Sequence, residues 1–366
     1  MVAVTGERLW VGNPGLPAMV LDQLSDRLQR ARRWLTATTV AMETSDQGVV
    51  VLRMVPPRTG QSPQITDCAV AALPEGFITA GVPQEPQALG HFIRDLLDEE
   101  EIPVRDVALD LPSACCQARL LRLPAAIPTP ALPRLVRQLG IDEEFPMALG
   151  QAQVATLPFS PEAGTGLQPV LVIGCERSTV AAWLQTMAAA GLTLRRLGWS
   201  QTTLLRALQG LQPLFGEREL VGLLDLQPRT SWLTLVLDGV PRTMTSLPSL
   251  PDPGFHQRLQ QQLDGEEPGP DGDLPPLDPQ ASQALAWALI NTVEAVQQHH
   301  GAMAQLYLVG PGSAYPHIAE QIAGQSGWPT ALLDPMALLC VRHPLPPEAV
   351  VGSAMAQLVT TALEEI

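Results

Sequence analysis

Two predicted strands and the polar turn between them decide the fold class of this chain. They lie in the stretch Glu219-Leu-Val-Gly-Leu-Leu-Asp-Leu-Gln-Pro-Arg-Thr-Ser-Trp-Leu-Thr-Leu-Val-Leu-Asp-Gly239. Leu220 to Leu224 is a short apolar run typical of a strand buried on both faces, and Trp232 to Leu237 is a second run that ends at Asp238-Gly239. The pattern predicts an antiparallel hairpin with a carboxylate, Asp225, at the end of its first strand.

The turn of this hairpin has the layout of a phosphate-binding turn without the usual glycine. Such a turn needs Gly, because its backbone N–H groups approach the anion closely and positive φ must cost little. Here the turn is Leu226-Gln227-Pro228-Arg229-Thr230, and its proline has no N–H. We take Asp225 and Thr230 as candidate nucleotide contacts. Alternatively, Asp225 simply caps the following turn, a common role for Asp.

A second hairpin of the same kind is predicted near the start of the chain. Val40 to Gly48 and Val49 to Val55 form two strand-like segments around a short polar turn. Its acid is Glu43, although a strict register places Met42 there. Thr44 and Ser45 are further candidate nucleotide contacts, or else ordinary turn residues.

A glycine turn follows a predicted strand in the second half of the chain. Gln305 to Val309 runs into Gly310-Pro-Gly-Ser313, ahead of a predicted helix from Tyr315 to Ala323. Gly310 and Gly312 allow close backbone approach, and a helix N-terminus favours an anionic group. Gly310, Gly312 and Ser313 complete the candidate nucleotide contacts.

Length and composition limit the classes of protein to which this chain can belong. The length of 366 residues predicts two to three domains or one bilobed fold, and 46% hydrophobic residues are ample for sizeable cores. No apolar run approaches the roughly 18 residues needed to span a bilayer. No export signal is evident, so we expect a cytoplasmic protein.

Charge and cysteine content exclude several functions. The net charge is −15, and all 22 basic residues are Arg, so nucleic acid is excluded as a partner because it needs a basic face. The absence of Lys removes the amine that usually contacts a transferable phosphate. The five Cys are odd in number and show no Cys-x-x-Cys spacing, which argues against structural zinc and a disulfide framework. We expect buried free thiols, with Cys115 and Cys116 on opposite sides of a strand.

The order and spacing of these segments resemble the PilM family, the actin-like proteins of type IV pilus assembly. The resemblance spans about residues 40 to 360. It is carried by Ala72-Leu-Pro-Glu-Gly-Phe-Ile78, Val107-Ala-Leu-Asp-Leu-Pro-Ser113, Arg119-Leu-Leu-Arg-Leu-Pro124, Glu144-Phe-Pro-Met147, Val170-Leu-Val-Ile-Gly-Cys175 and Leu308-Val-Gly-Pro-Gly-Ser313. It implies an α/β, duplicated actin-like (ribonuclease H-like) fold with two lobes, a nucleotide cleft between them and an inserted subdomain in the first lobe.

The resemblance also implies a division of the chain. We expect an N-terminal extension with an amphipathic helix at 1–39, a first lobe at 40–215 with its inserted subdomain at about 121–192, and a second lobe at 216–366. A mobile acidic loop is expected at 264–279, where Pro, Gly and carboxylates cannot form a core.

Departures from the family pattern shape the functional prediction. Gln227 stands where the family has Gly, and no Lys follows the first hairpin. We therefore expect weak ATP and Mg binding or none, little hydrolysis, and a scaffold role in the inner-membrane pilus platform. The alternatives are an active actin-fold ATPase or kinase, and the related actin-like component of type II secretion.

The expected partner is the cytoplasmic tail of a PilN-like membrane protein, alongside other pilus platform proteins. In the family this tail lies between the first lobe and its inserted subdomain, so Arg119, Arg122, Phe145 and Pro146 are candidates by location. The helix predicted over 17–35 carries four arginines on its polar side, so it is either a contact to an anionic membrane or a helix docked on the protein. We expect a peripheral position at the inner face of the cytoplasmic membrane.

Overall fold

The computed structural model describes residues 39–56, 62–139, 145, 147–162, 164–216, 218–263, 277–339, 341–342 and 352–365. The helix predicted over 17–35, the first thirteen residues of the predicted acidic loop 264–279, and Pro146 lie outside the described residues. Within the described ranges, we find no helix with the length and apolar character that a membrane crossing requires.

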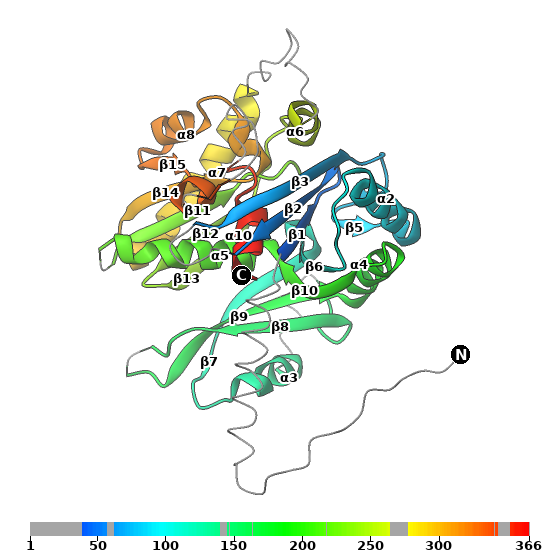
Figure 1. Cartoon of the computed structure of the whole chain (residues 1–366). Coiled ribbons are helices and arrows are strands. Elements are labelled where there is room, and N and C mark those ends of the chain that lie inside the picture. Colours follow the sequence, from blue (N-terminus) through cyan, green and yellow to red (C-terminus); the bar gives the residue numbers. More distant parts are fainter. Residues whose placement is uncertain are drawn as a thin grey trace, which may run out of the picture.

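The first sheet has the strand order β3-β2-β1-β6-β10 (Figure 1). Its strands are β1 (Thr39–Thr44), β2 (Gly48–Val55), β3 (Gln64–Ala72), β6 (Asp106–Leu111) and β10 (Thr193–Trp199). β1, β2 and β3 pair antiparallel, whereas β6 pairs parallel with both β1 and β10. The predicted first hairpin is therefore confirmed as β1 and β2.

The second sheet repeats this arrangement in the order β13-β12-β11-β14-β15. Its strands are β11 (Leu220–Asp225), β12 (Ser231–Leu237), β13 (Val240–Leu247), β14 (Met303–Val309) and β15 (Thr330–Leu332). As in the first sheet, the first three strands pair antiparallel: β13 with β12, and β12 with β11. β14 then pairs parallel with both β11 and β15. The repeated order confirms the predicted duplicated α/β fold.

A third sheet, of order β7-β9-β8, lies in the chain between β6 and β10 of the first sheet. Its strands are β7 (Cys116–Pro124), β8 (Ala152–Pro158) and β9 (Leu167–Glu176), all antiparallel, and α3 (Leu132–Gln138) packs against β8. β7 begins at Cys116, ahead of the predicted start of the inserted subdomain. The division of the chain into domains stays a prediction.

The remaining elements are helices and short connecting segments. Their bounds are β4 (Ile78–Thr79), β5 (Val82–Pro83), α2 (Pro86–Glu99), η1 (Ser113–Cys115), η2 (Thr129–Ala131), α4 (Arg177–Ala189), α5 (Ser200–Leu211), η4 (Gln212–Leu214), α6 (Phe255–Leu263), α7 (Pro279–His300), η5 (Pro311–Ala314), α8 (Ile318–Ser326), α9 (Pro335–Leu338) and α10 (Ala356–Glu364).

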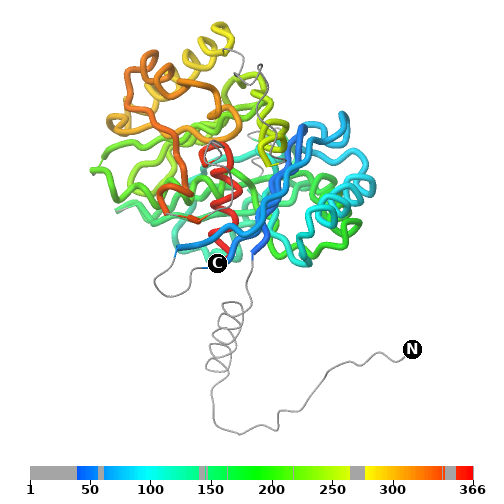
Figure 2. The backbone as a smooth tube through the Cα atoms, turned by 45° about the horizontal axis from the view of Figure 1, so that its top comes forward, coloured from blue at the N-terminus to red at the C-terminus, as the bar shows by residue number. Residues whose placement is uncertain are grey.

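Two helices are exchanged between the duplicated sheets. α5 follows β10 of the first sheet but packs on β11 and β12, and the C-terminal α10 packs on β1 and β2. Figure 2 shows the red C-terminal helix beside the blue N-terminal strands. The two helices also contact each other, so each sheet is held by a segment that belongs to the other half of the chain.

Alternation along β11 explains how one apolar run serves two cores. Val221 and Leu223 pack in the cluster shared with the first sheet, whereas Leu220 and Leu224 pack in the cluster of the second sheet with α7 and α8. A strand covered on both faces needs apolar residues at every position. The indole rings of Trp199 and Trp232 meet edge to face at 5.4 Å and join the two halves through the shared cluster.

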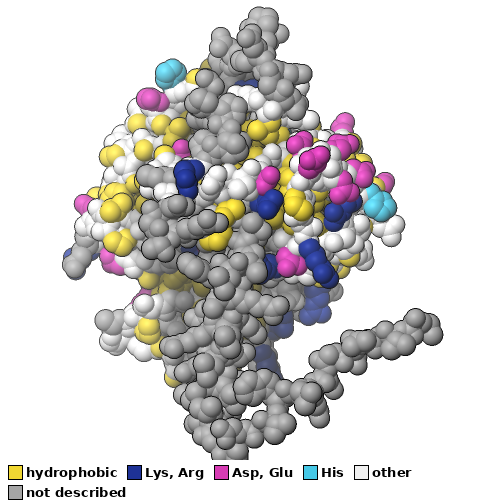
Figure 3. Space-filling view, viewed as in Figure 1, with side chains coloured by type: hydrophobic (Ala, Val, Ile, Leu, Met, Phe, Trp, Pro, Cys, Tyr) yellow, Lys and Arg dark blue, Asp and Glu magenta, His cyan; other side chains and the backbone are white. Residues whose placement is uncertain are grey.

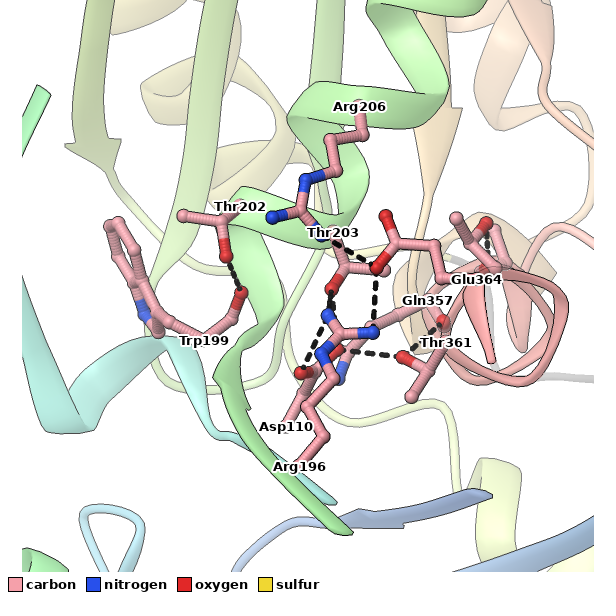
Figure 4. A network of polar contacts seen from close by, with 11 residues as sticks. Asp110, Arg196, Trp199, Thr202, Thr203, Arg206, Gln357, Thr361 and Glu364 are labelled. Carbon is pink, nitrogen blue, oxygen red and sulfur yellow. Dashed lines mark hydrogen bonds and ion pairs between the residues drawn. The ribbon is translucent and has the colours of Figure 1, made fainter. Parts of the chain in front are cut away.

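A buried carboxylate at the end of β6 ties the exchanged helices to the first sheet (Figure 4). The Asp110 side chain is fully buried, and its Oδ2 accepts hydrogen bonds of 2.6 Å from both Thr203 of α5 and Thr361 of α10. Arg196 of β10 pairs with Asp110 at 3.2 Å and with Glu364 of α10 at 2.6 Å. The ion pair with Arg196 and the two hydrogen bonds offset the cost of burying the Asp110 carboxylate.

Removing one donor to this carboxylate is expected to destabilise the fold. Thr361→Val keeps the shape of the side chain but deletes a hydrogen bond to a charged group, which costs about 1.5 to 3 kcal/mol. Thr360→Val is the matched control, since its hydroxyl donates to the Ala356 carbonyl within α10 and has no other hydrogen-bond partner among the described residues. Urea denaturation of both variants measures the difference, and equal losses for the two would contradict a special role for Asp110.

Candidate functional site

A cleft of about 250 Å³ lies between the turns of the two hairpins. Residues 43–47 of the first hairpin and 227–230 of the second line it, together with Pro112 to Ala114 after β6. Of the predicted nucleotide contacts, Thr44, Ser45 and Thr230 are on its wall. The duplicated topology therefore brings the two hairpin turns together, as a nucleotide site of this layout requires.

Ser45 is engaged within its own turn. Its Oγ accepts hydrogen bonds from the backbone N–H groups of Gln47 and Gly48, each at 3.1 Å. This is the local turn closure that Ser commonly provides. Thr44 differs, because its buried hydroxyl has no hydrogen-bond partner among the described residues.

An ion pair joins the two hairpin turns across the cleft. The Nε of Arg229, in the second hairpin, contacts the Asp46 carboxylate in the first. That carboxylate also accepts the backbone N–H groups of Ala80 at 3.0 Å and Gly81 at 2.9 Å. Ala80 and Gly81 both have positive φ, 50° and 78°, so this segment turns its N–H groups toward a single anion. The anion here is a side chain of the protein itself.

The predicted acids of the two hairpins lie close to each other. Asp225 is buried and accepts Nε2–H bonds from Gln201 of α5 at 2.6 Å and from Gln227 at 2.9 Å. Burial raises the pKa of Asp225 to about 6, against the lowering effect of these two bonds. Gln227, which stands in place of the expected glycine, thus has a defined structural role.

Glu43, and not Met42, is the acid of the first hairpin. Met42 is buried in the core of the first sheet, whereas Glu43 lines the cleft. Burial, followed by repulsion from Asp225 and Asp110, raises the pKa of Glu43 to about 8. The cleft therefore gathers carboxyl groups, and among its described lining residues Arg229 is the sole Arg.

The glycine turn is packed inside the protein and does not line the cleft. Gly310 has φ of 82°, and a Cβ there would overlap the Asp225 carboxylate. The Gly312 N–H donates to the Leu226 carbonyl at 2.9 Å, and a Cβ would lie 2.7 Å from that of Leu226. The buried Ser313 hydroxyl donates to that of Ser353 at 2.9 Å. The two glycines are needed for close packing of this turn on the second hairpin.

The predicted partner residues lie on and beside the third sheet. Arg119 places its guanidinium 6.0 Å from the centre of the Phe145 ring, a cation–π distance. Arg122 is largely exposed and pairs with Glu162 at 3.1 Å. Arg119 and Phe145 are thus brought together, whereas Arg122 has a partner of its own.

A separate groove of about 370 Å³ runs between the third sheet and the first. β8 and β9 form one wall, and β10 and the start of α5 form the other. Its lining includes Gln153, Ala155, Leu157, Ile173, Trp199 and Arg206. Of the predicted partner residues that the structure describes, Arg119, Arg122 and Phe145, none lines it. Along β8, Gln153 and Ala155 are exposed and line the groove, while Ala152 and Val154 are buried.

Acidic and basic side chains gather in different places on the face shown in Figure 3. On the face shown in Figure 3, carboxylates gather over α2, and basic side chains gather near α3 and the third sheet. The described residues in view form no continuous basic surface of the kind that nucleic acid requires. In the described part of the chain, no cluster of three or more His, Cys, Asp or Glu is suited to hold a metal ion.

Comparison with known structures agrees with this topology. The structure is similar to one from a PilM–PilN type IV pilus biogenesis complex, with a TM-score of 0.71 and 19% identity over 90% of this chain and 98% of that one. The chain has the actin-like fold. Lower similarity, with a TM-score of 0.46 for each, is found to an actin-like ATPase-fold protein of Bacteroides thetaiotaomicron (9% identity, 81% of this chain, 90% of that one) and to the cytoplasmic domain of EpsL of Vibrio cholerae (12%, 90% and 95%). No protein-family model and no curated protein matches the sequence.

Glu43 is expected to make stability fall as pH rises. Its folded pKa of about 8 lies above the ordinary value of 4.5, so its contribution is fully present below pH 4.5 and is lost as pH rises through 8. Glu43→Gln should therefore be more stable than wild type at pH 8, by about 4 kcal/mol, and within about 1 kcal/mol of it at pH 5. Urea denaturation at both pH values measures this.

Glu75→Gln is the matched control for that prediction, because Glu75 lines the same cleft but is exposed. It removes a carboxyl group from the same cleft without altering the buried Glu43. A Glu43→Gln variant with the wild-type pH profile would contradict a neutral, buried Glu43.

Proposed function

We propose that this protein is a non-enzymatic scaffold with weak or no ATP binding, held at the inner face of the cytoplasmic membrane within a type IV pilus assembly platform. The observation that carries the non-enzymatic part is the contact between Asp46 and Arg229 across the cleft. Asp46 engages the Arg229 guanidinium and the N–H groups of Ala80 and Gly81. These are the groups that would otherwise hold a phosphate group.

Charge in the cleft supports the same proposal. Phosphoryl transfer needs cationic groups and metal ions around the transferred phosphate. Here the lining residues include the carboxyl groups of Glu43, Asp46 and Glu75, with Arg229 already paired to one of them. A nucleotide polyphosphate would meet repulsion from Asp46 and Glu75, and Mg²⁺ would meet a neutral Glu43 below about pH 8.

The proposed partner is the cytoplasmic tail of a PilN-like protein, seated in the groove between the third sheet and the first. The shared fold with the PilM–PilN structure supports this choice, and so does the groove itself. Leu157, Ile173 and Trp199 offer apolar contact, and Arg206 stands half exposed at the rim. Apolar anchors within a polar rim suit capture of an extended peptide.

The predicted partner residues Arg119, Arg122, Phe145 and Pro146 stay candidates for a second contact with platform proteins. The predicted helix over 17–35 stays a candidate for contact with the membrane. Liposome co-sedimentation of the chain with and without residues 1–38 tests the latter, and equal pelleting of both forms would exclude it.

Filling the groove should abolish tail binding without harming the fold. Ala155 is exposed on β8 and lines the groove, so Ala155→Trp adds bulk where the tail is proposed to lie. Ala72→Trp, at the exposed end of β3, is the matched control. Fluorescence anisotropy with a labelled PilN-like tail peptide should show at least a tenfold loss of affinity for Ala155→Trp alone, equivalent to about 1.4 kcal/mol.

Two outcomes would contradict the proposal. One is failure of the wild-type chain to bind the tail either with or without Mg-ATP. The other is wild-type affinity in Ala155→Trp, which would place the tail elsewhere on the molecule.

A further inference from the structure

Two thiols face each other across neighbouring strands of the third sheet. Cys116, the first residue of β7, is paired in register with Cys175 near the end of β9. Directly opposed residues of an antiparallel pair have Cα atoms about 4.5 to 5.5 Å apart, which lies within the range of about 4.4 to 6.8 Å that a disulfide spans. The side chains of such a pair lie on the same face of the sheet.

Both thiols are free in this structure, and both line the groove between the third sheet and the first. Each thiol is the leading influence on the pKa of the other: it lowers the pKa of Cys175 and raises that of Cys116. Cys175 is therefore the better nucleophile of the two.

The neighbouring Cys115 is held elsewhere. Its Sγ donates to the Gly81 carbonyl at 3.0 Å, and it is not among the described residues that line the groove. Burial raises the pKa of Cys115 to about 12, so it is a poor nucleophile. Cys68, on β3 of the first sheet, has a pKa raised in the same way to about 12.

We propose that Cys116 and Cys175 form an oxidant-sensitive pair that closes to a disulfide across β7 and β9. The oxidant class is a small hydroperoxide, for which hydrogen peroxide is the probe. The Cys175 thiolate attacks one peroxide oxygen, which breaks the O–O bond and gives a sulfenic acid and, after protonation of the leaving hydroxide, one water molecule. The Cys116 sulfur then attacks the Cys175 sulfur and a second water leaves. Two thiols are oxidised by two electrons and the peroxide is reduced to two water molecules.

The disulfide would link β7 and β9 of the third sheet covalently along the wall of the groove. It links positions far apart in sequence, and closing a long loop in this way restricts the unfolded chain. The inference holds whichever segment the groove binds, so it is independent of the proposed partner.

Peptide mapping of the full-length chain after hydrogen peroxide treatment tests the proposal. Cleavage after arginine places Cys115 and Cys116 in residues 106–119 and Cys175 in residues 138–177. The expected result is a linked pair of these two peptides, at a mass lower by two hydrogen atoms, that dithiothreitol separates. Thermal denaturation of the oxidised chain should shift upward by about 5 °C and return on reduction.

Serine variants identify which two sulfur atoms form the disulfide. Cys115→Ser should keep the linked pair, whereas Cys116→Ser and Cys175→Ser should lose it. Because Cys115→Ser retains both proposed partners, its mapping remains decisive even if the other variants fold poorly. The proposal is overturned if Cys115→Ser yields no linked pair, if Cys116→Ser still yields one, if Cys68 is the thiol oxidised instead, or if linkage leaves the thermal midpoint unchanged.

Discussion

The Asp46 carboxylate joins three parts of the chain at the mouth of the cleft. It belongs to the first hairpin, accepts two N–H groups from the segment before α2, and pairs with Arg229 of the second hairpin. An exposed ion pair alone contributes little to stability, about 0 to 1 kcal/mol. Its importance is positional, because it places a fixed negative charge between the two turns that would have to hold phosphate.

Contacts outside the cleft hold the two halves of the duplicated fold together. α5 and α10 are exchanged between the sheets, and Asp110 is hydrogen-bonded to both of them. Trp199 and Trp232 extend one core across the boundary. These contacts are made between side chains of the protein itself. The proposed scaffold role needs such a connection between the two halves.

Local patterns in the sequence were sufficient to predict the duplicated fold but not the chemistry of the cleft. Both hairpins are set by short apolar runs and polar turns, which act within a few residues, and they were predicted correctly. The structural role of Gly310 could not be predicted, because it depends on Asp225, which lies far away in sequence. Gln227 looked like the loss of a phosphate turn, whereas its amide satisfies a buried carboxylate. The groove is lined by residues of two different sheets, and the Cys116–Cys175 pairing depends on strand register, so neither could be predicted from residue spacing.

Calorimetric titration of the full chain with Mg-ATP tests the central claim most directly, namely that side chains of the protein occupy the cleft in place of a nucleotide. The account predicts no saturable heat, which corresponds to a Kd weaker than about 1 mM. Saturable binding with a Kd of about 1 to 10 μM that is lost in Arg229→Ala would contradict it. Such a result would mean that Arg229 leaves Asp46 to hold phosphate, and that the cleft is a working nucleotide site.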